Sequence, residues 1–105
     1  YKNILLDANS GSTKLMLKSH VPVRLFKNKF FTEIEELEKM CANKEKLIEH
    51  LGHGRARKGM LDGDLESGEL EIGQICSLIK AIPTVKEMVV DLEIEFNQTI
   101  RLFRD

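Results

Sequence analysis

A long apolar stripe near the C-terminus sets the first limit on the fold. Apolar residues recur every three or four positions from Val85 to Phe103, which is the period of one face of an α-helix. Pro83 ends the segment before it, and Thr84 with Glu87 forms the capping box that begins a helix. At about 1.5 Å per residue the predicted helix is roughly 28 Å long. The sequence therefore predicts one long amphipathic helix at the C-terminal end of the chain.

A second apolar segment, from Ile72 to Ile82, also has helical spacing. Isoleucines recur along one face, and Cys76 and Leu78 broaden the apolar surface around the predicted helix. A helix that is apolar around much of its girth is normally surrounded by protein. This helix, together with the marginal pair of strands described next, indicates that the chain packs against a larger body.

The first part of the chain predicts shorter elements. Residues 1–8 have helical spacing and lead into a polar cluster that ends the helix. Alternating side chains then predict two strands, at 13–18 and 21–25. In the first strand, Leu15 and Leu17 are expected on one face, and Lys14, Met16 and Lys18 on the other. A pair of strands is marginal unless other elements cover it.

Two helices are predicted next. Thr32 and Glu35 fit a capping box, so we expect the first helix to begin there. Asn43 is expected to cap the second helix, and Gly52 to end it. The apolar stripe of the first helix is expected to comprise Ile34, Leu37, Met40 and Cys41.

The segment 55–68 has a different character, because glycine recurs every four or five residues. We predict a shaped loop, since glycine allows unusual φ angles and close approach to another surface. The glycines are Gly54, Gly59, Gly63 and Gly68.

Charge and hydropathy exclude several classes of function. The net charge is −1, from 16 basic and 17 acidic residues, whereas nucleic-acid binders usually carry a strongly basic face. The short basic run Arg55, Arg57 and Lys58 leaves nucleic-acid binding as a minor alternative. No apolar run approaches the roughly 18 residues of a membrane span, so we expect no membrane partner. The chain opens at Tyr1 without Met, which suggests a trimmed or domain-level chain.

Metal and disulfide sites are not predicted. Cys41 and Cys76 stand among apolar residues, which favours buried thiols in a reducing cytosol, with a disulfide as the minor alternative. The acidic loop that starts at Asp62 lacks the glycine and the final glutamate of a calcium loop. His50 and His53 lack a third ligand, so we expect them to be exposed or to end a helix.

One motif carries a family resemblance. Residues 59–74 read GMLDGDLESGELEIGQ, which resembles the late G-D-x-E-x-G-x-x-x-x-G-Q signature of the nitronate monooxygenase (2-nitropropane dioxygenase) family, which includes the flavin-dependent enoyl-(acyl-carrier-protein) reductases. Residues 21–30 are similar to the family's P-V-R-x-x-x-N strand and loop, and residues 83–89 to the start of its terminal helix. The three pieces occur in the family's order.

The resemblance implies a fold and a cofactor. Family members are FMN-binding (β/α)₈ barrels with a smaller domain inserted late, and this chain is similar to the part after the last barrel strand. The barrel, the phosphate-binding loops and the family's catalytic histidine are absent, so no residue receives a catalytic role. The resemblance implies that Gly73, Gln74 and Ile75 approach the flavin ring from the side. FMN is expected in the full-length parent but not on this chain alone.

We therefore predict an α+β, mostly helical fold, corresponding to the lid domain and C-terminal helices of the barrel enzyme. Residues 1–70 are expected to form a lid-like α/β segment, and 71–105 the helices that pack on the barrel. The parent would act on alkyl nitronates or enoyl thioesters in the cytoplasm, and the chain alone would be inactive. The alternative is a small noncatalytic interaction or dimerisation module, and exposed apolar faces favour a homodimer. A weakly basic rim would suit an acyl-thioester carrier; its residues are Lys18, Arg24, Lys27 and Lys29.

Overall fold

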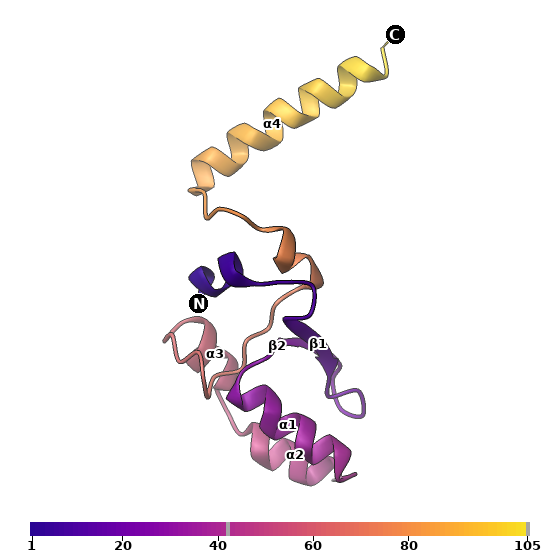
Figure 1. Ribbon diagram of the computed structural model, residues 1–105, viewed down its shortest axis with the longest axis vertical. Helices are drawn as coiled ribbons and strands as arrows, with labels where there is room; N and C mark the ends of the chain where they lie inside the picture. Colours follow the sequence, from indigo (N-terminus) through magenta and orange to yellow (C-terminus); the bar gives the residue numbers. More distant parts are fainter. Residues whose placement is uncertain (42, 105) are drawn as a thin grey trace.

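The computed structural model describes residues 1–41 and 43–104, and the molecule consists of a small body from which one long helix projects (Figure 1). Its extents are 58 × 29 × 22 Å, and its radius of gyration is 17.8 Å. A compact domain of about 100 residues has a radius of gyration of about 13 Å, so the chain is far more extended than that. In chain order the elements are η1 (Lys2–Asp7), β1 (Thr13–Met16), β2 (Val23–Phe26), α1 (Lys29–Lys39), α2 (Lys44–Leu51), α3 (Arg55–Met60), η2 (Gln74–Leu78) and α4 (Val85–Leu102).

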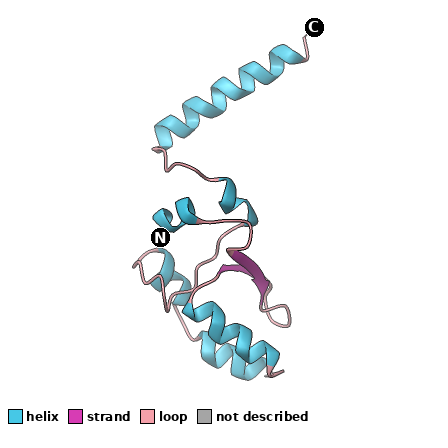
Figure 2. Ribbon diagram, viewed as in Figure 1, coloured by secondary structure: helices cyan, strands magenta, loops and turns pink. Residues whose placement is uncertain are grey.

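The predicted class, α+β and mostly helical, is confirmed for the described residues (Figure 2). No barrel is present in that part of the chain, because its only named strands form a two-stranded sheet. η1 is a 3₁₀ helix rather than the α-helix expected for residues 1–8.

The sheet is an antiparallel hairpin to which a third extended segment is added. Strands β1 and β2 pair from Thr13 with Phe26 to Met16 with Val23. Residues 69–72 lie along the other edge of β2, where the Phe26 N–H donates to the Leu70 carbonyl at 2.9 Å. A further bridge links Leu25 to Glu71. This edge is what connects the glycine-rich segment to the hairpin.

The expected faces of the first strand are wrong. Met16 and Leu17 are buried while Leu15 is 40% exposed, so Leu15 and Leu17 do not share a face. Leu17 lies beyond the strand and has a positive φ of 56°. The chain turns at Leu17, so two consecutive side chains enter the core, which strict alternation along a strand does not allow.

Helix α1 begins before the predicted capping box. Its N-cap is Asn28, whose side chain accepts from the Phe31 N–H at 2.9 Å, whereas Thr32 lies within the helix and donates to the Asn28 carbonyl. The earlier start turns Phe30 and Phe31 into the core, while Met40 is 74% exposed. The Asn43 cap of α2 and the end of α2 at Gly52 are confirmed.

Two core clusters fill the body. The first lies between the hairpin and helices α1 and α2, and its buried members are Met16, Leu17, Leu25, Phe30, Phe31, Ile34 and Leu47. The second lies between the 69–72 segment and the two 3₁₀ helices, and its buried members are Ala8, Leu70, Ile72 and Cys76.

Three further expectations need correction. The 55–68 segment is not all loop, because α3 occupies its first six residues. The helix expected from Ile72 to Ile82 is reduced to the 3₁₀ turn η2, since residues 69–72 are extended against β2 and Ile79 is extended again. Cys76 is buried but Cys41 is exposed, and both thiols are free.

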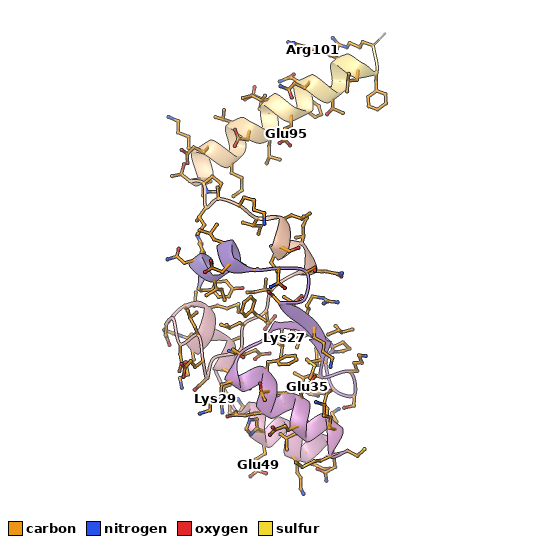
Figure 3. All side chains as sticks on the ribbon, in the orientation of Figure 1. Lys27, Lys29, Glu35, Glu49, Glu95 and Arg101 are labelled. Atoms are coloured by element: carbon orange, nitrogen blue, oxygen red, sulfur yellow. The ribbon has the colours of Figure 1, made fainter. Side chains whose placement is uncertain are left out.

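Helix α4 confirms the predicted long helix that begins after Pro83 with a capping box. It is not packed on the body. Thr84 and Glu87 form the full capping box, and no residue of the helix is buried. Phe96 is 63% exposed and Leu92 is 61% exposed. The helix stands clear of the body, and Figure 3 shows its side chains, including Glu95 and Arg101, away from every other element. In the described residues, no helix combines the length and apolar character needed to cross a membrane.

Candidate functional site

The glycine-rich motif is built on a backbone-to-backbone contact. Gly59, at the end of α3, and Gly68 are both buried. A Cβ on Gly59 would lie 2.7 Å from the Glu69 carbonyl oxygen, and a Cβ on Gly68 would collide with the backbone of Gly59 and Asp64. No other residue fits these two positions without moving the chain. The motif glycines therefore fix the path of the segment that leads to Gly73.

Asp64 shapes the turn between the two glycines. Its Oδ1 accepts hydrogen bonds from the N–H groups of Ser67 at 2.8 Å and Glu66 at 3.1 Å. Its other oxygen lies 3.0 Å from the Lys58 ammonium. The pKa of Asp64 is lowered, chiefly by the bond from the Ser67 N–H and then by Lys58. The aspartate of the G-D pair thus holds the loop rather than facing a site.

Asn28 joins the two motifs that are far apart in the sequence. Besides capping α1, its Nδ2 donates to the carbonyls of Leu65 at 3.0 Å and Gly68 at 2.8 Å. The Phe30 N–H also donates to the Glu66 carbonyl at 3.0 Å. This explains why asparagine stands at the end of the P-V-R-x-x-x-N stretch, since both ends of its amide are used.

Arg55 also holds the 65–68 loop in place. Its Nη1 donates to the Ser67 carbonyl at 2.9 Å, and its guanidinium lies over the Phe30 ring, 5.3 Å from the centroid. A guanidinium held in this way serves packing. The nucleic-acid alternative loses one of its three basic residues to this internal role.

The predicted flavin-side segment lies at the end of this scaffold. Gly73, Gln74 and Ile75 are exposed, with Ile75 at 67%. A Cβ added to Gly73 would meet nothing within 4 Å. Gln74 and Ile75 line an open hollow of about 400 Å³, together with Ser10, Ser77 and Leu78. The segment is accessible, and its part in holding a cofactor remains a prediction.

The predicted basic rim is divided in the structure. Arg24 donates to the Thr13 hydroxyl at 3.3 Å and is partly buried, whereas Lys18, Lys27 and Lys29 are exposed. Figure 3 places Lys27 and Lys29 on the body near the start of α1. Only the lysines are available to an outside partner.

The histidines do not assemble a metal centre. Within residues 1–41 and 43–104, no group of three or more His, Cys, Asp or Glu residues could hold a metal ion. His50 lies in the last turn of α2, where its Nε2 is 3.0 Å from Glu33 Oε2 and its ring stacks on Phe30. The position of His50 in the last turn is as expected, whereas its ring is partly buried and joins α2 to α1.

A second cavity, of about 370 Å³, was not predicted from the sequence. It lies between the 17–23 loop and the junction of α2 and α3, and its polar lining includes His20, Glu69 and Glu71. Burial raises the pKa of Glu69, and the charge of Glu71 raises it further. The signal was the alternation of Glu69, Leu70, Glu71 and Ile72, which identifies a strand with one acidic face.

The fold matches solved structures over nearly its whole length. FabK from Thermotoga maritima superimposes with a TM-score of 0.80 at 30% identity, covering 99% of this chain and 33% of FabK. A point variant of the same protein gives a TM-score of 0.74 at 28% identity, with 99% and 30% covered. The chain thus spans about a third of the length of the FabK chains it matches. No protein-family model and no curated protein matches it.

Proposed function

We propose that this chain is the C-terminal third of an FMN-dependent oxidoreductase of the nitronate monooxygenase type, to which the enoyl reductase FabK belongs. The match to FabK carries the proposal, because it extends over 99% of the chain at a TM-score of 0.80. The same match covers 33% of FabK, which supports a part of the enzyme rather than the whole.

The exposed apolar surface of α4 supports the proposal that a further part of the enzyme packs on it. Helix α4 exposes a continuous apolar stripe that includes Val89, Leu92 and Phe96, at 58%, 61% and 63% exposure. Apolar area is worth about 25 cal/mol per Å² when it is removed from water, so a stripe this long is normally covered. In the proposed enzyme the barrel covers α4, and η2 brings the Gly73 turn to the edge of the cofactor.

In the proposed enzyme, the exposed turn would lie beside one edge of the flavin. Gly73 leaves room for close approach, and the Gln74 amide can donate to or accept from a ring or a substrate. FMN would supply the redox chemistry when bound, and this chain would position the ring edge and help exclude water. The substrates we propose are alkyl nitronates or enoyl thioesters.

A chimera tests the proposal. The corresponding third of Thermotoga maritima FabK is replaced by this chain, and the product is examined for bound FMN and for substrate-dependent oxidation of the reduced flavin. We expect a yellow protein with measurable turnover. A chimera that folds but retains no FMN would contradict the proposal.

Paired variants of the chimera separate the site from the scaffold. Gln74→Ala removes the exposed amide and should lower turnover while FMN remains bound. Gln98→Ala, a matched change on α4, should leave turnover unchanged. Equal activity of both variants would remove Gln74 from the proposed site.

An interaction module remains the second candidate, and the bare α4 stripe is the observation in its favour. Both candidates, a fragment of a flavin enzyme and an interaction module, predict that the 105-residue chain does not bind FMN by itself. Titration of FMN into the chain, followed by flavin fluorescence, tests this shared expectation. We expect no saturable binding, because the phosphate-binding loops of the parent are not part of the chain. Saturation at micromolar FMN would mean that the chain binds the cofactor by itself.

A further inference from the structure

The 370 Å³ cavity beside α2 and α3 has the size of a small-molecule site. Ligand pockets of about 300 Å³ and above are typical, and a cavity of about 150 Å³ already holds benzene. One wall is apolar and includes Leu17, Val23 and Leu51. This cavity shares no lining residue with the hollow beside Gln74 and Ile75.

Two carboxylates line the cavity from one extended segment. Leu70 and Ile72 are 1% and 7% exposed in the second core cluster, so the alternating side chains of Glu69 and Glu71 lie on the opposite face. Glu69 is only partly exposed, and its raised pKa reflects its burial and the neighbouring charge of Glu71. Like charges side by side on a half-buried face are unfavourable unless a cation joins them.

Among the described residues, Arg55 is the one Lys or Arg residue in the cavity lining, and its hydrogen bonds go to backbone carbonyls rather than to the carboxylates. Arg55 lines the cavity, but its Nη1 bonds to the Ser67 carbonyl and its guanidinium lies over Phe30. Within the described residues, none of the ion pairs includes Glu69 or Glu71. The negative charge of the cavity is therefore available to an outside group.

His20 supplies the second polar feature. Its backbone N–H donates to the Leu17 carbonyl at 2.9 Å, which places the residue in the loop that lines the cavity. Its ring Nδ1 is buried and has no hydrogen-bond partner among the described residues. Buried polar atoms are rarely left unpaired, because the lost hydration is not replaced.

We propose that this cavity binds a small organic cation, a primary ammonium group on a short aliphatic body. The ammonium lies between the carboxylates of Glu69 and Glu71, and the aliphatic part lies along the apolar wall. An organic cation is favoured over a metal ion, because no group of three or more His, Cys, Asp or Glu residues in the described chain could hold a metal. This site is independent of the flavin proposal.

The test uses the ¹⁵N-labelled chain and n-butylammonium chloride, with 1-butanol as the neutral molecule of the same shape. We expect saturable shifts of the amide signals of Gly52, Gly54 and Glu71 with the amine, and binding at least about tenfold weaker with the alcohol. Glu69→Gln should weaken the amine at least about tenfold. Glu36→Gln, the same change on an exposed position of α1, should not.

Several results would overturn the proposal. These are equal binding of amine and alcohol, an absence of saturable shifts, and an unchanged affinity in Glu69→Gln. KCl or MgCl₂ alone producing the same shifts would assign the cavity to an inorganic cation and overturn the organic class. If Glu69→Gln loses its dispersed amide spectrum, Glu71→Gln replaces it, because Glu71 is exposed and its change leaves the core intact.

Discussion

Substitution of Gly68 by alanine tests the central contact of the glycine motif. The new Cβ would collide with the Cα of Gly59 and with the Asp64 carbonyl oxygen, and it would lie 2.5 Å from the Gly59 nitrogen. Real Cβ atoms do not approach other atoms so closely, so one of the two chain segments must move. All these neighbours are backbone atoms, and no side chain can rotate to relieve the contact.

The expected cost follows from what would have to shift. Overpacking a core typically costs about 1–3 kcal/mol, and a backbone obstacle belongs at the upper end, so we expect a loss of about 3 kcal/mol in the free energy of unfolding. At about 4–8 °C per kcal/mol, the melting temperature should fall by more than about 12 °C. This is a large part of the about 5–15 kcal/mol by which domains are stable.

Gly73→Ala is the matched control, because it adds the same methyl group elsewhere. Gly73 has a φ of −64°, and nothing lies within 4 Å of the added carbon. This variant should be unchanged or more stable, by about 0.4–1 kcal/mol. Urea unfolding followed by circular dichroism measures both. If Gly68→Ala unfolds within about 0.5 kcal/mol of the wild type, the reasoning about the contact is refuted.

Four further results are expected. Asn28→Ala removes the α1 cap and two hydrogen bonds to the 65–68 loop, so it should lower the free energy of unfolding in urea by about 2–3 kcal/mol. A loss no larger than that of a surface substitution would contradict the role of Asn28 in joining α1 to the loop. Thr84→Ala should lower the helicity of α4 in Cα chemical shifts while the unfolding midpoint of the body stays constant, since α4 is not packed on it. The Lys14 and Lys39 ammonium groups lower the pKa of Glu35 from 4.5 to about 2. The stabilisation from the Glu35 carboxylate is therefore present above pH 4.5 and is lost as the pH falls toward 2. Glu35→Gln should lack this acid-dependent loss when the free energy of unfolding is measured at about pH 6 and about pH 2.5. Leu92→Glu should reduce any self-association seen by sedimentation of the isolated chain, and an unchanged sedimentation coefficient in an associating chain would place the contact elsewhere.

The helix boundaries show which sequence signals were sufficient. The caps at Asn43 and Thr84 were predicted correctly because each bond runs to an N–H three residues away. The capping box predicted at Thr32 was wrong, because the helix begins one turn earlier with Asn28 as its cap. Asn28 prevails because its amide also reaches the carbonyls of Leu65 and Gly68, which are 37 and 40 positions away in the sequence.

The isoleucine-rich segment illustrates the opposite case. Its spacing predicted a helix, but the Ile72 N–H donates to the Arg24 carbonyl and Leu70 accepts from Phe26, so residues 69–72 become a strand-like edge. Hydrophobic period cannot separate a short buried strand from a helix when the competing hydrogen bonds come from a distant hairpin.

The candidate sites divide in the same way. Gly73, Gln74 and Ile75 are consecutive, so the sequence alone kept them together, and the structure added only that they are exposed. The alternation at residues 69–72 predicts one acidic face, but no local pattern predicts that His20, 49 positions before Glu69, lines the same cavity. The sequence by itself determined the α4 stripe and two of the caps, because these depend on spacing and hydrogen bonds within a few residues. The tertiary structure decided where α1 begins, which of the two candidate segments is a helix and which polar groups share a cavity, because those outcomes depend on hydrogen bonds and burial between distant parts of the chain.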